Sequence, residues 1–315
     1  MQSSLLSVEI LPGGIEQWAT ETPEAGRPST EFPFVYMENH LGVPKKILYQ
    51  LYLSALDLLK SDNATSQLDA SCVIVLANPA HATALNVRKR HIQSGTLSAH
   101  AELKFSEMVL PSSRPCSKES IQWAHRRWVG IAGSPLEVPE IPADAIEAEF
   151  KLISKCCETY PRNYHAWSHH HFVMQCIYVS LRGSHPADSP FLALFTAEFS
   201  NLRRWIESHV SDYSAIHQFC SLIARLQFLD LPQYHSTLAP LADSVVHFEH
   251  AVSLIKAFPN HESLWMYLRA TIDLSPSPNA DALPASAVAS TAQFEGLHRD
   301  RFILWTKKRA KITGF

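Results

Sequence analysis

The chain has 315 residues, 46% of them hydrophobic, and a formal net charge of -3 at pH 7. A chain of this length and composition can bury a large core, and its slightly acidic balance argues against a general binder of nucleic acids. It contains no apolar run near the roughly 20 residues that a membrane-spanning helix needs. Its six cysteines form no Cys-x-x-Cys pair, and its first residues do not resemble a signal peptide. We therefore expect a reduced, cytoplasmic protein without a membrane span.

Residues 1–34 show no sustained periodicity and contain turn signals such as Pro12-Gly13-Gly14. We expect a largely irregular N-terminal segment there, followed by a single helical-repeat domain over residues 35–315. The first helix is predicted at about 44–60, and because it is apolar almost all round it is expected to be buried. A second helix at about 66–77 leads into Asn78-Pro79, where Asn78 is the expected N-cap of a third helix.

The most informative stretch covers residues 160–172, with the sequence YPRNYHAWSHHHF. Pro161 ends the preceding helix, and Asn163 is a good N-cap because its side-chain oxygen can accept from an amide of the first turn. Tyr164, Trp167 and His171 then follow at steps of three or four, which places large rings on one helical face. The stretch therefore predicts a hinge between two helices.

Four weaker copies of this hinge flank it, at residues 78–90, 118–128, 211–219 and 259–269. The residues that stand in the place of Trp167 are Leu85, Trp123, Ile216 and Trp265. These five repeat anchors are separated by 38, 44, 49 and 49 residues, an interval that suits one helical hairpin plus a variable loop. We predict an all-α solenoid of stacked helical hairpins, with hinges near residues 78, 117, 163, 212 and 260. A flexible loop is expected at 275–292 and a final helix at about 293–310.

Basic side chains gather at and just after the hinges, namely Arg88, Lys89, Arg90, Lys118, Arg126, Arg127 and Arg162. In a stacked array equivalent positions line up, so these charges could form a ridge that faces an anionic ligand. The alternative, favoured for most of them, is that they neutralise loop carbonyls or pair with acids of the next repeat. The histidines His165, His169, His170 and His171 lack neighbours that would complete a zinc site, so no metal site is predicted. The chain also shows no phosphate-binding loop and no nucleophile elbow.

The hinge sequences resemble the repeat of protein prenyltransferase alpha subunits. The resemblance rests on residues 163–167 (Asn-Tyr-His-Ala-Trp), on the arginines after Trp123 and on Asn260-x-Glu262-Ser263-x-Trp265, and it covers about residues 45–275. Residues 37–43 and 209–212 look most like a divergent branch of that family. The resemblance implies a right-handed crescent of helical hairpins, an alpha-alpha superhelix, wrapped around a separate beta subunit.

The family resemblance also implies an activity. Members transfer a farnesyl or geranylgeranyl group from its diphosphate to a cysteine near the C-terminus of a protein substrate. The beta subunit holds the zinc and the isoprenoid pocket, magnesium can accompany the diphosphate, and this chain would hold no cofactor. The family's lysine that neutralises the leaving diphosphate falls on Lys118, five residues before Trp123. Tyr164 and His165, with Arg162 beside them, fall on the diphosphate region. Lys118 is expected in the first turn of its helix, where a cation is mildly unfavourable.

Several positions depart from the family pattern. A glutamine that accompanies reading of a C-terminal Cys-a-a-X box is replaced by Ile121, and the Asn-Tyr pair after the lysine by Glu119-Ser120. These departures favour a beta subunit of the Rab geranylgeranyltransferase kind, which works without that contact. Two hypotheses therefore follow: an alpha subunit of a protein geranylgeranyltransferase, or a non-catalytic helical-repeat scaffold that binds a protein or peptide. The first requires Lys118, and the second gives it no special role.

Overall fold

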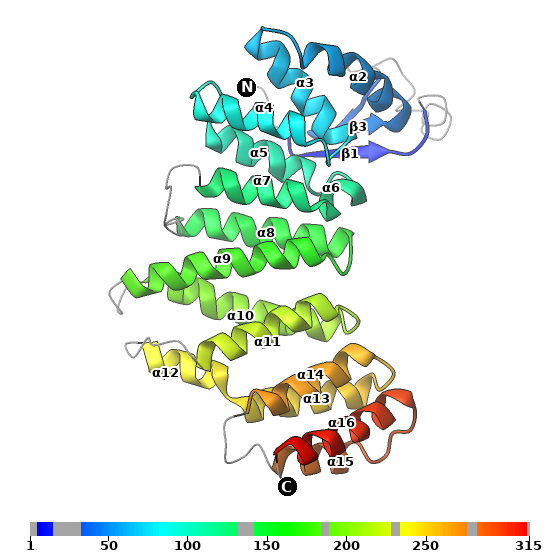
Figure 1. Cartoon of the computed structure of the whole chain (residues 1–315), viewed down its shortest axis with the longest axis vertical. Helices are drawn as coiled ribbons and strands as arrows, with labels where there is room; N and C mark the ends of the chain where they lie inside the picture. The colour runs from blue at the N-terminus through cyan, green and yellow to red at the C-terminus, as the bar shows by residue number, and fades with distance from the viewer. Residues whose placement is uncertain are drawn as a thin grey trace. The chain divides into compact units, whose positions relative to one another are not determined.

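The computed structural model describes residues 5–14, 33–131, 142–183, 189–227, 234–275 and 282–313. The described residues are mainly helical, and successive helices pack against one another in pairs (Figure 1), as the periodicity predicts. The chain forms two compact units, Met1–Cys176 and Ile177–Phe315, which meet in sequence within helix α9 (Tyr164–Gly183). No described helix combines the length and the apolar character needed to cross a bilayer.

The first unit begins with a three-stranded sheet of order β1-β3-β2 that the sequence analysis missed. Strand β1 (Ser7–Leu11) pairs in parallel with β3 (His40–Pro44), which pairs antiparallel with β2 (Val35–Met37). Glu38 and Asn39, with φ of 49° and 68°, make the tight turn between β2 and β3. The prediction of an irregular segment is therefore wrong for Ser7–Leu11, because a five-residue strand is specified by its pairing with β3 and not by a local period. Residues 15–32 of that segment lie outside the described residues.

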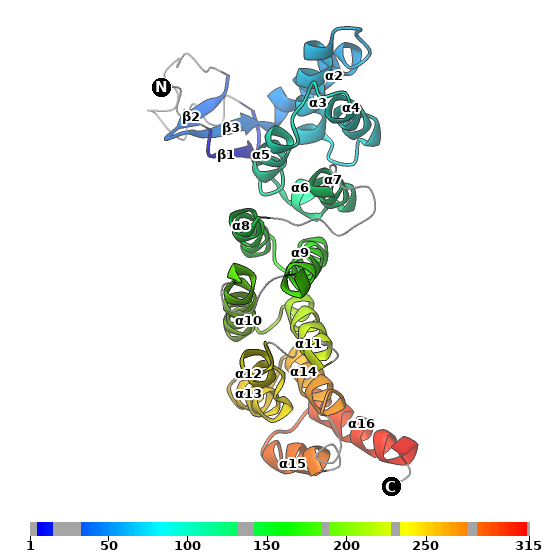
Figure 2. The same ribbon diagram turned by 90° about the vertical axis from the view of Figure 1, so that its left-hand side faces the viewer.

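The remaining elements of the first unit are α2 (Lys45–Leu58), α3 (Ala64–Ala77), α4 (Ala82–Gln93), α5 (Ala99–Val109), α6 (Arg114–Lys118), α7 (Ser120–Ile131), α8 (Ala143–Thr159) and the start of α9. Helix α3 packs between α2 and α4, and α5 packs on α7 (Figure 2). The expectation that α2 is buried all round is wrong. Its residues Leu48 and Ala55 are buried, but Tyr49, Leu53 and Leu58 are 62%, 49% and 50% exposed. The described part of the chain covers one face of this helix and leaves the other in solvent.

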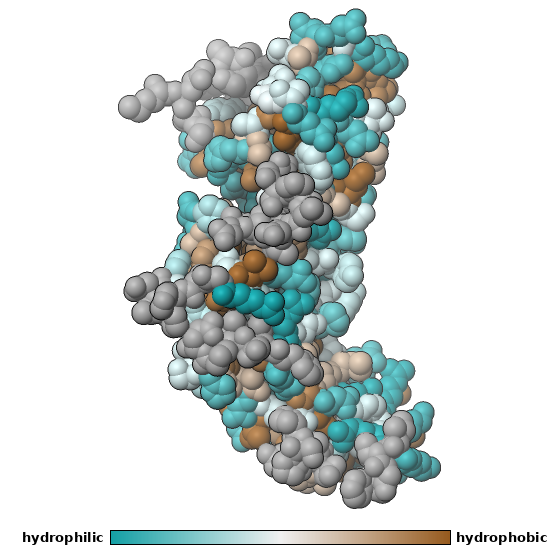
Figure 3. Space-filling view, turned by 60° about the vertical axis from the view of Figure 1, so that its left-hand side comes forward, coloured by the Kyte–Doolittle hydropathy of each residue, from teal (hydrophilic) through white to brown (hydrophobic). Residues whose placement is uncertain are grey.

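The second unit contains α10 (Pro190–Ser208), α11 (Tyr213–Gln227), α12 (His235–Leu238), the 3-10 helix η3 (Ala239–Ala242), α13 (Ser244–Ala257), α14 (Glu262–Asp273), α15 (Ala282–Ser290) and α16 (Leu297–Thr313). Its core is rich in aromatic contacts, with Phe199 and Phe219 ring centroids 4.8 Å apart. The loop expected at 275–292 is wrong for Ala282–Ser290, because four alanines favour helix and Ala287 is fully buried. On the face drawn in Figure 3, hydrophobic residues form small separate patches among hydrophilic ones.

Buried ion pairs join successive helix pairs of the first unit. Glu149 on α8 accepts two hydrogen bonds from Arg126 on α7, at 2.6 and 2.8 Å, and one from Nε2 of His169 on α9, at 2.8 Å. One pair earlier, Glu102 on α5 accepts from Arg88 on α4 and from His125 on α7. Arg126 and His169 are at most 4% exposed. These contacts fix each helix pair against the next.

The two acidic groups are held in their charged form. Burial alone would raise the pKa of Glu149, but the hydrogen bond from His169 and the charge of Arg126 outweigh it and lower the pKa to about 2. The pKa of Glu102 is lowered for the same reasons, by His125 and Arg88 against the effect of burial. Burial lowers the pKa of His169 despite its bond to Glu149, so its imidazole is neutral and donates through Nε2–H.

We expect the fold to lose stability in acid through Glu149. Since its pKa is about 2 in the folded protein and near 4.5 in the unfolded chain, its contribution is fully present above pH 4.5 and disappears as the pH falls through 2. The contribution is on the order of 3 kcal/mol. Urea unfolding between pH 6 and pH 2 measures it. Glu149→Gln should be about 3–5 kcal/mol less stable at neutral pH, because Arg126 is left unpaired, and should lose less stability in acid. The exposed Glu147→Gln on the same helix is the control, and equal acid dependence in all three proteins would contradict the assignment.

Candidate functional site

The five repeat anchors are all buried, and each is the fourth residue of the helix that follows its hinge. Leu85, Trp123, Trp167, Ile216 and Trp265 are at most 4% exposed. The predicted hinges near 78, 163, 212 and 260 lie between helices, and the one near 117 lies in the short helix α6, with the break at Glu119. The periodicity therefore located the hinges correctly.

The residue four positions before each anchor directly precedes the helix that follows the hinge. In four repeats its side chain accepts from a first-turn amide: His81 from Ala84, Glu119 from Ile121, Asn163 from Ala166, and Asp212 from Ser214 and Ala215. The prediction of Asn163 as a cap is confirmed. The prediction of Asn78 is wrong, since Asn78 follows the last residue of α3 and His81 caps α4.

The carbonyl six residues before each anchor accepts a side-chain hydrogen bond. We call these five oxygens the hinge carbonyls; they belong to Pro79, Ser117, Pro161, Val210 and Pro259. Their donors are Gln122 for Pro79, Trp123 and Asn163 for Ser117, Lys118 for Pro161, Ser263 for Val210, and Trp265 for Pro259. In four of the five cases a donor comes from the neighbouring repeat. Polar contacts therefore join the first three hinges to one another within the first unit, and the fourth hinge to the fifth within the second unit.

Ser117 is the residue of this site that sequence reasoning missed. Its carbonyl accepts from the Trp123 indole at 2.7 Å and from the Asn163 amide at 3.0 Å, and its hydroxyl lies 2.7 Å from the same amide. It is completely buried. The available signal was its spacing, six residues before the anchor, which Pro161 and Pro259 share.

Lys118 belongs to the second hinge, but its side chain reaches the third hinge, where it contacts Pro161, 43 residues further along the chain. Its Nζ donates to the Pro161 carbonyl at 2.8 Å, and its side chain is half-buried. An ammonium has three N–H donors, so two remain for an anion. Lys118 is the last residue of α6, not in a first turn as predicted, and a cation there is favourable to the helix dipole.

The other predicted site residues follow directly in sequence. Arg162 is exposed and has a φ of 58°, which is unusual for a residue with a side chain. Tyr164 is 65% exposed, and its ring lies edge-on to that of His165 with centroids 5.4 Å apart. The structure thus brings Lys118 to the turn that carries Arg162, Tyr164 and His165. Their contact with an isoprenoid diphosphate stays a prediction.

The remaining basic and histidine candidates have structural contacts. Arg88 and Arg126 are buried in the ion pairs described above, so the favoured alternative, pairing with acids of the next repeat, holds for both. The Lys89 ammonium lies 5.1 Å from the Trp128 ring centroid. His169 binds Glu149, and His170 packs on the rings of Phe150 and Trp167. Within the described ranges no three potential ligands are grouped around a common metal position.

Known proteins show similarity to this region of the chain. Residues 146–177, which include the hinge before α9, match the family model "Protein prenyltransferase alpha subunit repeat". The chain is 28% identical over 291 residues to protein prenyltransferase alpha subunit repeat-containing protein 1-A of Xenopus laevis, covering 77% of this chain and 64% of that protein. It is 31% identical to the 1-B protein of the same species over 59% of this chain and 45% of that protein. It is 28% identical to the human repeat-containing protein 1 over 84% of this chain and 74% of that protein.

These matches confirm the resemblance to the alpha subunit family and to the divergent branch indicated by residues 37–43 and 209–212. The chain spans less than two thirds of the length of the two frog relatives. The names of these relatives identify a repeat and do not state a reaction.

The backbone at Arg162 can be tested separately from its charge. Glycine adopts positive φ without steric cost, whereas any other residue there is strained by about 1 kcal/mol. Arg162→Gly should therefore be more stable than Arg162→Ala by about 1 kcal/mol, although both remove the guanidinium. Urea unfolding of the two variants measures this difference. An Arg162→Gly protein that is less stable than Arg162→Ala would contradict the left-handed conformation of this turn.

Proposed function

We propose that this homologue of the protein prenyltransferase alpha subunit repeat-containing proteins is the alpha subunit of a heterodimeric protein geranylgeranyltransferase. The reaction would move an isoprenoid from its diphosphate to a cysteine of a protein substrate. The observation that carries the proposal is the position of Lys118, held by the Pro161 carbonyl beside Arg162, Tyr164 and His165. Such a group of cationic and hydrogen-bonding side chains suits an anion.

The role of Lys118 follows from the charge that develops in the reaction. As the carbon–oxygen bond to the diphosphate breaks, negative charge grows on the leaving group, and a fixed cation stabilises the transition state more than the ground state. The bond to Pro161 fixes the ammonium before the substrate arrives, which removes part of the cost of ordering a long side chain. Arg162 would add a second charge, and Tyr164 a hydroxyl donor.

The beta subunit completes the proposed enzyme. We place there the zinc, which would lower the pKa of the substrate thiol, and the pocket for the isoprenoid chain. A subunit of the Rab geranylgeranyltransferase kind fits this chain, because Ile121 stands in place of the glutamine that accompanies reading of a C-terminal Cys-a-a-X box. Ile121 packs against the core of the first unit, so it is occupied in holding the fold.

The first test of the proposal concerns dependence on the partner. The purified chain alone should transfer no prenyl group, and transfer should appear when a beta subunit of that kind is added at a 1:1 ratio. Radiolabelled geranylgeranyl transfer to a protein with C-terminal cysteines measures both. Robust transfer by the isolated chain, with contaminating beta subunit excluded by mass spectrometry, would contradict the assignment of the zinc and the isoprenoid pocket to the beta subunit.

The second test concerns Lys118 in the assembled enzyme. Lys118→Met should slow single-turnover transfer by roughly 10²–10³, the usual effect of losing one preorganised contact to developing charge. Lys118→Arg should retain most of the rate because it keeps the cation. Lys60→Met is the matched control, since Lys60 is 79% exposed and lies in the turn between α2 and α3.

Lys118 also donates a hydrogen bond to the Pro161 carbonyl, so its replacement could slow the reaction by disturbing the hinge. Measuring the stability of the variant separates this effect from loss of the cation. Lys118→Met should unfold at nearly the same urea concentration as the unmodified chain, since one partly exposed hydrogen bond contributes only about 1 kcal/mol. An unchanged single-turnover rate for Lys118→Met would leave the chain as a helical scaffold for its partner, which is the competing hypothesis.

A further inference from the structure

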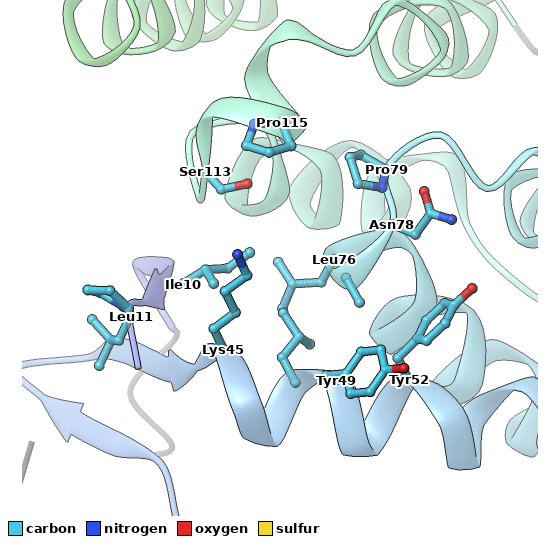
Figure 4. Close-up of a pocket in the computed structure, with 13 residues that line it drawn as sticks. Ile10, Leu11, Lys45, Tyr49, Tyr52, Leu76, Asn78, Pro79, Ser113 and Pro115 are labelled. Carbon is cyan, nitrogen blue, oxygen red and sulfur yellow. The ribbon is translucent and has the colours of Figure 1, made fainter. Parts of the chain in front are cut away.

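The first unit contains a surface cavity of about 490 Å³ between the N-terminal sheet, helix α2 and the first two hinges (Figure 4). This volume lies within the range of about 300–1,000 Å³ that is typical of small-molecule sites. Ile10 and Leu11 of β1, Leu48 of α2, and Leu76 and Ala77 of α3 form its apolar walls. Tyr49, which is 62% exposed, extends the apolar surface outward.

One charged side chain lines this cavity. Lys45, the first residue of α2, rises into the space between Ile10 and Leu76, with its nitrogen toward the side of Ser113 (Figure 4). No acidic residue is among the described residues that line the cavity, and none of them forms an ion pair with Lys45. The cavity therefore combines apolar walls with a positive charge that none of its described lining residues neutralises.

The start of α2 adds to this positive potential. Its N-cap residue is Pro44, which supplies no side-chain cap, and its first turn contains no acidic residue. Lys45 and Lys46 instead stand at the positive end of the helix dipole, where acids are preferred and lysines are mildly unfavourable. An anion bound at Lys45 would relieve this arrangement.

Polar groups at the walls can complete the recognition of a head group. Ser113 lies on the same side of the cavity as the Lys45 nitrogen, whereas Asn78 and Tyr52 lie toward the other end (Figure 4). A small inorganic anion would leave the apolar walls unfilled, and an uncharged hydrocarbon would leave Lys45 without a partner. The cavity fits a molecule that has both parts.

We propose that this cavity binds a small amphiphile, with its apolar body against Leu48, Leu76 and Tyr49 and one anionic head group at Lys45. A carboxylate and a phosphate share the chemistry that Lys45 and Ser113 recognise, so both head groups are tested. The site lies within the first unit and requires no beta subunit. It is therefore independent of the proposed transferase function.

The test is a fluorescence titration of the purified full chain with cis-parinaric acid, an apolar chain with one carboxylate. Saturable binding at a 1:1 ratio is expected. Lys45→Met should weaken it about five-fold, the upper end for a solvent-accessible ion pair. Lys46→Met is the matched control, because Lys46 begins the same helix but does not line the cavity, and it should change the affinity less than two-fold.

The apolar wall is tested by Tyr49→Ser, which should weaken binding of both parinaric acid and its uncharged methyl ester. Tyr213→Ser, at a tyrosine that is 59% exposed and begins α11, is its control. Both tyrosines are exposed, so neither change should unfold the chain, and circular dichroism checks this. Displacement by farnesyl monophosphate or by palmitate then assigns the head group to phosphate or to carboxylate.

Four results would overturn the proposal. The first is the absence of saturable 1:1 binding by a folded chain. The second is equal weakening by Lys45→Met and Lys46→Met, which would indicate attraction to the general charge of this helix end. The third is equal affinity for parinaric acid and its methyl ester. The fourth is Lys45-dependent binding of inorganic phosphate with the same affinity as the amphiphile.

Discussion

The hydrogen bond to the hinge carbonyl is the interaction on which the arrangement of the repeats depends. A turn between two helices contains backbone carbonyls that belong to neither helix and need partners from elsewhere, and a chain of helical hairpins repeats this problem at every hinge. Here the carbonyl six residues before each anchor accepts a side-chain donor, and in most repeats that donor comes from the neighbouring hinge. The anchors Trp123 and Trp265 use their indole N–H in the same way, so one side chain both fills the core and satisfies the hinge. The hydrophobic core supplies most of the stabilisation, and these polar contacts set the register between repeats.

The buried Arg–Glu–His contacts set that register a second time, at a greater electrostatic cost. Taking Arg126 and Glu149 out of water costs several kcal/mol for each ion, and their attraction repays it only because the pair is bidentate and His169 fills a remaining acceptor position. Replacing a buried ion pair by apolar side chains of similar volume is often neutral for stability, so we assign these contacts a role in selecting one helix stacking over a neighbouring one. These contacts also reduce the number of basic side chains that a ligand could reach. Since Arg88 and Arg126 are enclosed, a ligand at the hinges of the first unit would meet Lys118 and Arg162 instead.

The sequence predicted those parts of the molecule that repeat locally. Five anchors at regular intervals were sufficient to place the hinges, because a helix pair has a period that a single chain reveals. The Asn163 cap was predictable for the same reason, whereas Asn78 misled because Asn-Pro is a strong start signal in itself and His81 is not. Strand β1 depends on a partner about 33 residues away, and the ion pairs join positions 14 to 23 residues apart, so neither leaves a local pattern. The cavity beside Lys45 is lined by four separate segments of the chain, so it too leaves no local pattern in the sequence.

The evidence for a function of Lys118 comes from its position in the structure and not from its place in the sequence. Spacing placed it in a first turn, where an unfavourable charge would itself have suggested a role. The structure places it at the end of α6, where the charge is mildly favourable, so that indication disappears. The indication that remains is the bond to Pro161, which holds the ammonium at the hinge of the next repeat and uses one of its three N–H donors. A lysine needed only to hold that carbonyl could be replaced by any neutral donor, as Gln122 does for Pro79 and Ser263 does for Val210. A cation at this one hinge carbonyl is therefore the feature that the fold alone does not require.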